Sequence, residues 1–283
     1  MPDLLLYFTT AACWLVLSGL AWRAARPAMA GGAVARRADE PPYRGLGLTP
    51  VLVPVALILH GMLVYRGILA TEGLDLGVAN AISLIVWLTV LIYWLAGLAF
   101  QGLASILGLM APVALLAVLF QALVPSHHFV TYGGSPLFAL HFAIAMLAYS
   151  LFIVATVHAV VMLAEEKWLH RGVMPPFLRT LPPLLEMEAL LFRIVLAAFI
   201  LLTFTVVSGV FFSEQVFGKP LTFTHKTVFG ILSWLIFGGL LAGHYLRGWR
   251  GRTAVHWTLA GFTALLLAYV GSKLVLELVL KRG

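Results

Sequence analysis

The chain has 283 residues, of which 62% are hydrophobic and only 10% are charged, whereas soluble domains average about 45–50% and about 25%. This composition excludes an ordinary soluble enzyme. Lys and Arg exceed Asp and Glu by 18 to 11, but the basic residues form no stripe interleaved with aromatic residues, which excludes a nucleic-acid-binding groove. The single cysteine, Cys13, lies in an apolar run, which excludes a disulfide framework and a cysteine-rich metal site.

Long apolar stretches predict membrane-spanning helices. A helix needs about 20 mainly apolar residues to cross the hydrocarbon core, because each residue adds about 1.5 Å. The stretches that meet this length cover residues 4–22, 50–66, 78–97, 103–124, 137–164, 187–212, 223–246 and 256–280. The uncharged run from Val78 to Val124 is too long for one span, so we expect a reversal around Gly97 to Gly102. The sequence therefore predicts an all-α, polytopic membrane helix bundle of about eight spans, forming a single integral membrane domain over residues 1–283.

Lys and Arg concentrate in alternate loops, which predicts the orientation of the chain. These residues are Arg23, Arg26, Arg36, Arg37 and Arg44 after the first span, Lys167, Arg171 and Arg179 after the fifth, and Arg247, Arg250 and Arg252 after the seventh. Short basic loops stay in the cytoplasm. We therefore expect both termini outside, in a bacterial inner membrane. Residues 24–47, rich in Ala, Gly, Arg and Pro, are expected to form a flexible cytoplasmic connector.

Histidines within the predicted spans are the most informative polar residues, because ionisable side chains in lipid are costly and usually face a bundle interior. His60 lies in the outer half of the second span, and His141 and His225 begin the fifth and seventh spans just inside the outer face. His158 lies about 25 Å beyond His141 along the fifth span, and His244 lies about 28 Å beyond His225 along the seventh. We therefore expect an outer histidine level, at which these three could converge, and a separate inner level.

Neutral imidazole is a common axial ligand of haem iron, and two such residues on facing helices can hold the metal from opposite sides. The outer level therefore predicts haem, of b type and held non-covalently, with His141 and His225 as the iron ligands. Arg66 is an outward-side cation that can meet a haem carboxylate. Aromatic residues can wall an apolar slot, or anchor helices at the interface. They are Trp87, Tyr93 and Trp94 on the third span, with Phe211, Phe212, Phe217 and Phe223 around the outer end of the sixth and seventh spans. The alternative for each histidine is a hydrogen bond to a carbonyl or water at a helix end.

Several segments read together resemble the cytochrome c assembly superfamily of CcsA-like haem-handling membrane proteins, and more closely its short HemX-type and YpjD-type branch. These segments are LHGMLVYRG at 59–67, NAISLIVWL at 80–88, LHFAIAMLAYSLF at 140–152, TFTVVSGVFF at 203–212, HKTVFGILSWLIFGGLLAGHYLRGWRGR at 225–252 and LAYVGSKLVLE at 267–277. The resemblance implies that His60, His141 and, with a shift of about two residues, His244 match haem-ligating histidines. Depth along the helices instead separates His60 from His244 and favours the pair His141 and His225.

The chain also departs from the pattern of this superfamily. Haem-presenting members have a tryptophan-dense segment that ends in WDPK, where this chain has EQVFGKPLTFTHK at 214–226. They also have a further outer histidine after the last span, where this chain has only LELVLKRG. The resemblance therefore implies a haem-binding or haem-handling protein with a degenerate haem-presentation segment, and not a complete cytochrome c synthetase.

Two other functions stay open. The first is a haem-free membrane subunit that regulates or assembles a partner protein. The second, ranked last, is a small-solute transporter, and the spacing of Lys273 and Glu277 on one face of the last span suggests an ion pair instead of a relay. The sequence has no P-loop, nucleophile elbow or HExxH pattern, so we do not expect an enzyme. The expected partners are the lipid bilayer and a protein of haem handling or cytochrome assembly, and not nucleic acid.

Overall fold

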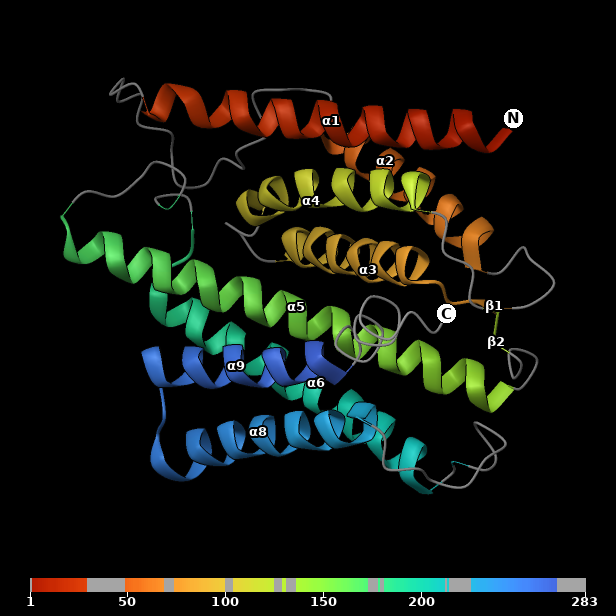
Figure 1. Ribbon diagram of the computed structural model, residues 1–283. Helices are drawn as coiled ribbons and strands as arrows, with labels where there is room; N and C mark the ends of the chain where they lie inside the picture. The colour runs from red at the N-terminus through yellow and green to blue at the C-terminus, as the bar shows by residue number, and fades with distance from the viewer. Residues whose placement is uncertain are drawn as a thin grey trace. The chain divides into compact units, whose positions relative to one another are not determined.

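The computed structural model describes residues 2–29, 49–68, 74–99, 104–124, 129–130, 136–172, 178, 181–211, 213 and 225–268. Across these residues the chain is helical apart from one short strand pair and its turns (Figure 1). Seven of the described helices are long and apolar enough to cross a membrane. This confirms the predicted all-α, polytopic membrane helix bundle. Two compact units are present, one of Met1–Thr131 with Glu165–Pro183 and one of Tyr132–Ala164 with Leu184–Gly283.

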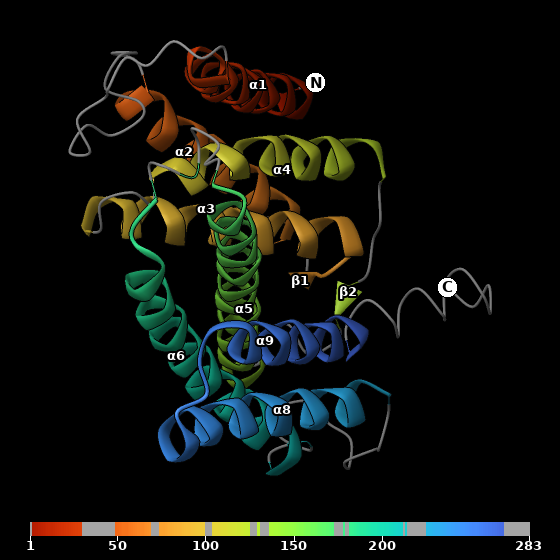
Figure 2. The same ribbon diagram turned by 90° about the vertical axis from the view of Figure 1, so that its left-hand side faces the viewer.

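The first unit is built on four helices. They are α1 (Pro2–Met29), α2 (Thr49–Ile68), α3 (Val78–Ala99) and α4 (Ala104–Leu123). Helix α1 packs against α2 and α4, and α3 packs against α2 and α4 (Figures 1 and 2). The predicted reversal between the third and fourth spans is confirmed, because α3 ends at Ala99 and α4 begins at Ala104.

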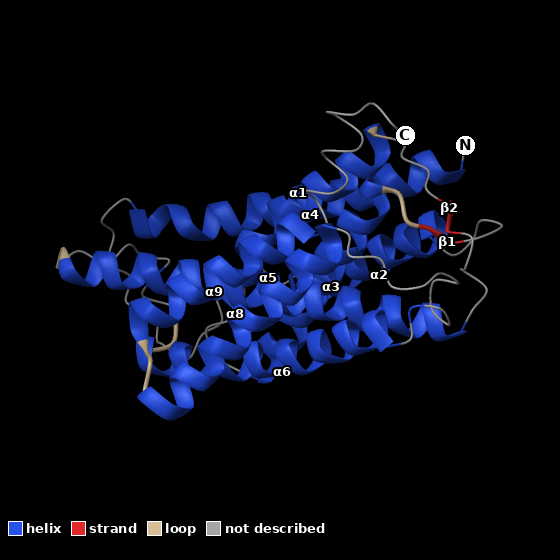
Figure 3. Cartoon of the chain, turned by 60° about the horizontal axis from the view of Figure 1, so that its bottom comes forward, coloured by secondary structure: helices blue, strands red, loops and turns tan. Residues whose placement is uncertain are grey.

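Two short strands close one end of this unit. Strand β1 (Leu74–Asp75) pairs antiparallel with β2 (Phe129–Val130), so that Leu74 lies opposite Val130 (Figure 3). The ladder joins the segment that precedes α3 to the segment that follows α4. The buried carboxylate of Asp75 accepts the Gly77 N–H at 3.0 Å, which fixes the turn just ahead of α3.

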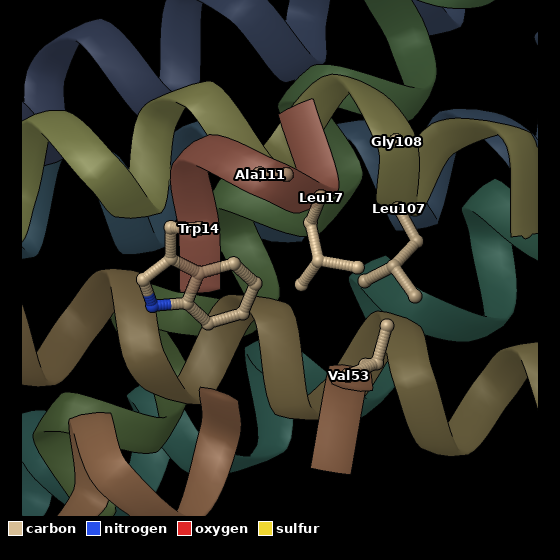
Figure 4. A pocket seen from close by; sticks show the side chains of 6 residues that line it. All are labelled: Trp14, Leu17, Val53, Leu107, Gly108 and Ala111. Carbon is tan, nitrogen blue, oxygen red and sulfur yellow. The ribbon is translucent and has the colours of Figure 1, made fainter. Parts of the chain in front are cut away.

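The core between α1, α2 and α4 is closely packed. Figure 4 shows a small cavity lined by side chains of these three helices, among them Trp14, Leu17, Val53 and Leu107. Its volume is about 10 Å³, which is about the space that one water molecule needs. This cavity is therefore far too small to hold an organic cofactor.

The second unit is built on four further helices. They are α5 (Pro136–His170, up to Ala164 in this unit), α6 (Leu184–Phe211), α8 (His225–Arg247) and α9 (Gly251–Leu266). Helix α8 packs against α6 and α9. Phe152 of α5 stacks on Phe237 of α8 with 4.0 Å between ring centroids, and Tyr149 donates its hydroxyl to the Leu265 carbonyl at 3.0 Å.

Three helices extend at one end by five or more residues beyond the predicted spans. Helix α1 runs to Met29, so it includes the first part of the predicted connector 24–47, and α5 runs to His170 instead of ending at 164. Helix α9 begins at Gly251 instead of 256. Hydropathy marks only the apolar part of a helix, and these helices continue through polar residues at their ends. The later part of the eighth predicted span, with Lys273 and Glu277, lies outside the described residues.

The packing of α9 on α8 depends on the absence of a side chain at Gly261. A Cβ there would lie 2.8 Å from two carbons of the buried Phe237 ring, whereas a Cβ at Gly230 of α8 would meet nothing within 4 Å. We expect Gly261→Ala to lower the free energy of unfolding by about 1–3 kcal/mol. Gly230→Ala is the control, and its better helix propensity should leave stability unchanged or raised. Thermal unfolding of the detergent-solubilised chain measures both, and equal midpoints for the two variants would contradict this packing.

Candidate functional site

His141 is held by a serine of the neighbouring helix. Its Nδ1 lies 2.7 Å from the Ser208 hydroxyl of α6, and the same hydroxyl lies 2.7 Å from the Phe204 carbonyl. A carbonyl can only accept, so the single hydroxyl proton of Ser208 is used there and its oxygen accepts from His141 Nδ1–H. The lone pair of the neutral imidazole is therefore on Nε2, one of the two nitrogens that bind metals.

His225 is the first residue of α8 and is exposed. Within the second unit, the beginnings of α5 and α8 lie on the same side as the end of α6 (Figure 1, right). The structure thus places the two predicted iron ligands near corresponding ends of their helices. That both imidazoles bind one iron stays a prediction.

The inner histidines bond to backbone carbonyls. His158, which is fully buried, donates from Nε2 to the Met187 carbonyl at 3.0 Å. His244 donates from Nδ1 to the Trp249 carbonyl at 2.9 Å, and its ring stacks on Phe192 with 3.5 Å between centroids. Because α5 is continuous, His141 and His158 are about 25 Å apart along it. The bonds of His141 to Ser208 and of His158 to Met187 therefore join α5 to α6 at two points that lie far apart along this antiparallel pair.

Glu188 has a structural partner at the turn between α8 and α9. Its Oε2 accepts the Gly251 N–H at 2.9 Å, and its Oε1 lies 3.7 Å from Arg250 Nε. Gly251 has a φ of +53°, and Gly248, earlier in the turn, has a φ of +68°. Both values are in the left-handed region that favours glycine. The carboxylate therefore binds the first N–H of α9 and fixes the turn that precedes this helix.

His60 belongs to a chain of hydrogen bonds inside the first unit. The bonds join His60 Nε2 to Ser83 Oγ (2.9 Å), Ser83 Oγ to Gln121 Oε1 (2.7 Å), Gln121 Nε2 to Asn80 Oδ1 (3.0 Å) and Asn80 Nδ2 to the Gly67 carbonyl (3.0 Å). All four side chains are buried, and His60 and Ser83 have no exposed surface. The chain links α2, α3 and α4.

An apolar groove between α2 and α3 includes two of the aromatic residues that were predicted to wall a slot. Trp87, Trp94 and Tyr65 line it, and its volume is about 430 Å³. Trp87 donates its indole N–H to the Leu57 carbonyl at 2.8 Å, which turns the polar edge of the ring toward α2. Gly61 allows this close approach, since a Cβ there would lie 3.1 Å from the indole ring. No histidine is among the described residues that line the groove.

The remaining predicted residue, Arg66, is exposed in the last turn of α2. Among the described residues there is no group of three or more His, Cys, Asp or Glu side chains that could hold a metal ion.

Residue-by-residue reading of the sequence missed Ser208, Ser83 and Gln121. The signal was weak, because each is one of a few polar residues in a mainly apolar predicted span. Serine within a helix usually bonds its own backbone, so its sequence position does not reveal a second partner. The spacing of residues along one helix cannot show which hydroxyl a histidine on another helix will meet.

Comparison with known proteins gives one family for most of the chain. The family model described as "Cytochrome C assembly protein" matches residues 48–280. "Inner membrane protein YpjD" of Escherichia coli (strain K12) is 27% identical over 227 residues, which are 80% of this chain and 85% of that protein. A 28.8 kDa protein from the nifR3-like 5' region of Azospirillum brasilense is 31% identical over 53% of this chain and 56% of its own length.

A further relative covers a shorter part of the chain. "Cytochrome c biogenesis protein CcsA" of Prochlorococcus marinus (strain NATL1A) is 27% identical over 90 residues, which are 32% of this chain and 29% of that protein. The match to YpjD and the apolar helices identify a multi-pass protein of the inner membrane. With the family model covering residues 48–280, the chain belongs to the cytochrome c assembly protein family.

Proposed function

We propose that this protein binds and handles haem in cytochrome c biogenesis, with His141 as an iron ligand and His225 as its partner on the opposite face of the haem. Membership of the cytochrome c assembly family supports the process, and so does the biogenesis role in the name of the CcsA relative. The single observation that carries the ligand assignment is the bond between His141 Nδ1 and Ser208.

This bond supports ligation because metal-binding histidines almost always donate their other ring N–H to a fixed acceptor, which sets the tautomer and the ring orientation. Ser208 is itself fixed, since its hydroxyl is bonded to the Phe204 carbonyl at 2.7 Å. His141 is half-buried five residues after the start of α5. It therefore combines a defined lone pair on Nε2 with a position near a helix end.

The donor set suits haem better than a bare metal ion. The described residues contain no three-residue group of metal ligands, whereas a porphyrin provides four nitrogens and asks the protein only for axial ligands. When bound, haem would be the cargo of the assembly process, held non-covalently as a b-type group. His244 and Arg66 stay predicted cofactor-binding residues, and a protein partner in assembly stays a prediction.

We also propose that both termini lie outside the inner membrane. The basic residues Lys167 and Arg171 at the end of α5, and Arg247, Arg250 and Arg252 at the turn between α8 and α9, are exposed at helix ends. Such residues favour the cytoplasmic side, and this orientation puts the starts of α5 and α8, with His141 and His225, on the outer side.

The first test is haem binding by His141. The full chain, purified in detergent from haem-replete cells, should give a haem absorbance spectrum and a positive pyridine haemochrome assay. His141→Ala should reduce the haem content at least about tenfold. The control is His170→Ala, which removes an exposed histidine that bonds the Glu166 carbonyl of its own helix at 2.8 Å. A colourless wild-type protein would reject the proposed function, and would leave the haem-free assembly subunit as the better hypothesis.

The second test addresses Ser208. Ser208→Ala removes the acceptor of His141 Nδ1–H, so haem affinity should fall about 10–100-fold, while Ser208→Thr, which keeps a hydroxyl, should restore most of it. Thr205→Val is a matched control, because the Thr205 hydroxyl bonds the Leu201 carbonyl of its own helix at 2.9 Å. Haem titration followed by absorbance measures all three variants. Equal affinities for Ser208→Ala and Thr205→Val would contradict a role for this bond.

The third test addresses orientation. Alkaline phosphatase fused at the C-terminus should be active in cells, because it folds only outside the cytoplasm, and a fusion within the turn between α8 and α9 should be inactive. The opposite pattern would reverse the proposed topology.

A further inference from the structure

The chain of hydrogen bonds around His60 has a fixed direction that begins at the backbone. Asn80 Nδ2 lies 3.0 Å from the Gly67 carbonyl and 3.3 Å from the Asp75 carbonyl. Carbonyl oxygens only accept, so the amide nitrogen of Asn80 must face them and its oxygen must face away. That oxygen then accepts from Gln121 Nε2 at 3.0 Å.

The orientation of the Asn80 amide also determines which group donates in each of the remaining hydrogen bonds, from Gln121 to His60. With its nitrogen bonded to Asn80, Gln121 presents its oxygen to Ser83, which must donate its only hydroxyl proton over 2.7 Å. The Ser83 oxygen can then only accept from His60 Nε2, at 2.9 Å. The neutral ring of His60 therefore carries its proton on Nε2 and its lone pair on Nδ1.

Burial supports the same tautomer. His60 Nδ1 has no hydrogen-bond partner within the part of the chain that the structure describes. A buried N–H without an acceptor is much rarer than a buried acceptor that is not fully satisfied, and a doubly protonated, charged ring at membrane depth would cost more still. Each of these costs opposes a proton on Nδ1.

The surroundings of His60 are also closed. The side chain has no exposed surface, and the equally buried Trp14 of α1 meets the ring edge to face, with 6.1 Å between centroids. Gly67 makes the network possible, because a Cβ there would lie 2.9 Å from Asn80 Oδ1 and Gln121 Nε2. The same side chains that fix the tautomer therefore bring α2, α3 and α4 together around it.

We propose that Ser83 and Gln121 lock His60 as an Nε2–H donor that holds α2, α3 and α4 together, and that His60 is therefore not an iron ligand in this chain. Nε2 is occupied by its proton and by Ser83. Nδ1 is the ring nitrogen nearer to the side chain's own Cβ and backbone, so it is the less accessible of the two nitrogens to a large planar group. His60 thus does not fit the ligand role that the family resemblance implies, and its contribution is to the packing of the first unit.

Glutamine and asparagine substitutions separate the two roles. The amide nitrogen of glutamine takes the position of Nε2 and can still donate to Ser83, whereas asparagine reaches only the position of Nδ1. In the full detergent-solubilised chain, His60→Gln should keep the thermal midpoint and the haem content of the wild type. His60→Asn and Ser83→Ala should lower the midpoint by several degrees. The control for Ser83→Ala is Thr89→Val in the same helix, whose buried hydroxyl bonds the Ile85 carbonyl at 2.8 Å.

A direct measurement on the wild type does not depend on any variant folding. Nitrogen NMR of the protein with isotope-labelled histidine should show the proton of His60 on Nε2, with the signal assigned by its loss in His60→Gln. A proton on Nδ1 would contradict the proposal that Ser83 and Gln121 hold His60 as an Nε2–H donor. A His60→Gln variant that unfolds as early as His60→Asn would do the same.

The measurement of haem content rests on the proposed function, whereas the thermal midpoints and the NMR spectrum do not. The failure of this inference can therefore be distinguished from the failure of the proposed function. A His60→Gln variant that keeps its midpoint but loses haem would show that His60 is an iron ligand, and would overturn the inference. If the wild type bound no haem, the proposed function would fail, while the midpoints and the NMR spectrum would still decide whether His60 is locked.

Discussion

A polar side chain inside a membrane bundle must find its hydrogen-bond partners within the protein, because the lipid offers none. His60, His141, His158 and His244 obey that constraint by bonding to a neighbouring helix or turn, and the position of the bond decides what each ring can do. His60 bonds α3 through Ser83, His141 bonds α6 through Ser208, and His158 bonds α6 through a backbone carbonyl. The same hydrogen bonds therefore hold the helices together and determine which ring nitrogen of each histidine carries the proton.

Two classes of histidine follow from which ring nitrogen donates. His60 and His158 donate from Nε2, are fully buried, and leave Nδ1 without a partner among the described residues. His141 and His244 donate from Nδ1, are half-buried, and carry the lone pair on the more distant Nε2. Because Nε2 is the nitrogen furthest from the backbone, only the second class can present its lone pair to a large planar ligand. Burial and tautomer thus agree in separating structural histidines from candidate ligands.

The sequence was sufficient for the architecture, because length and hydropathy alone decide whether a helix can cross a membrane. It also predicted the reversal between α3 and α4, since no single helix of that length fits a bilayer. It failed at helix ends such as Met29 and His170, where the helix continues through polar residues that hydropathy does not count. The separation of His141 from His158 along α5 was likewise predictable, because the helical rise converts sequence separation into distance along a continuous helix.

The tautomers were not predictable from the sequence, because each depends on a bond between residues far apart in the chain. Ser83 lies 38 positions from Gln121, and His141 lies 67 positions from Ser208. A sequence match also cannot distinguish a ligand from a hydrogen-bond donor, since it compares residue types and does not show which ring nitrogen carries the proton. The family resemblance implies the same ligand role for His60 and His141, yet Ser83 fixes the proton on Nε2 in the first and Ser208 fixes it on Nδ1 in the second. The serine bonded to each histidine therefore determines which ring nitrogen holds the lone pair, which the identity of the histidine alone does not show.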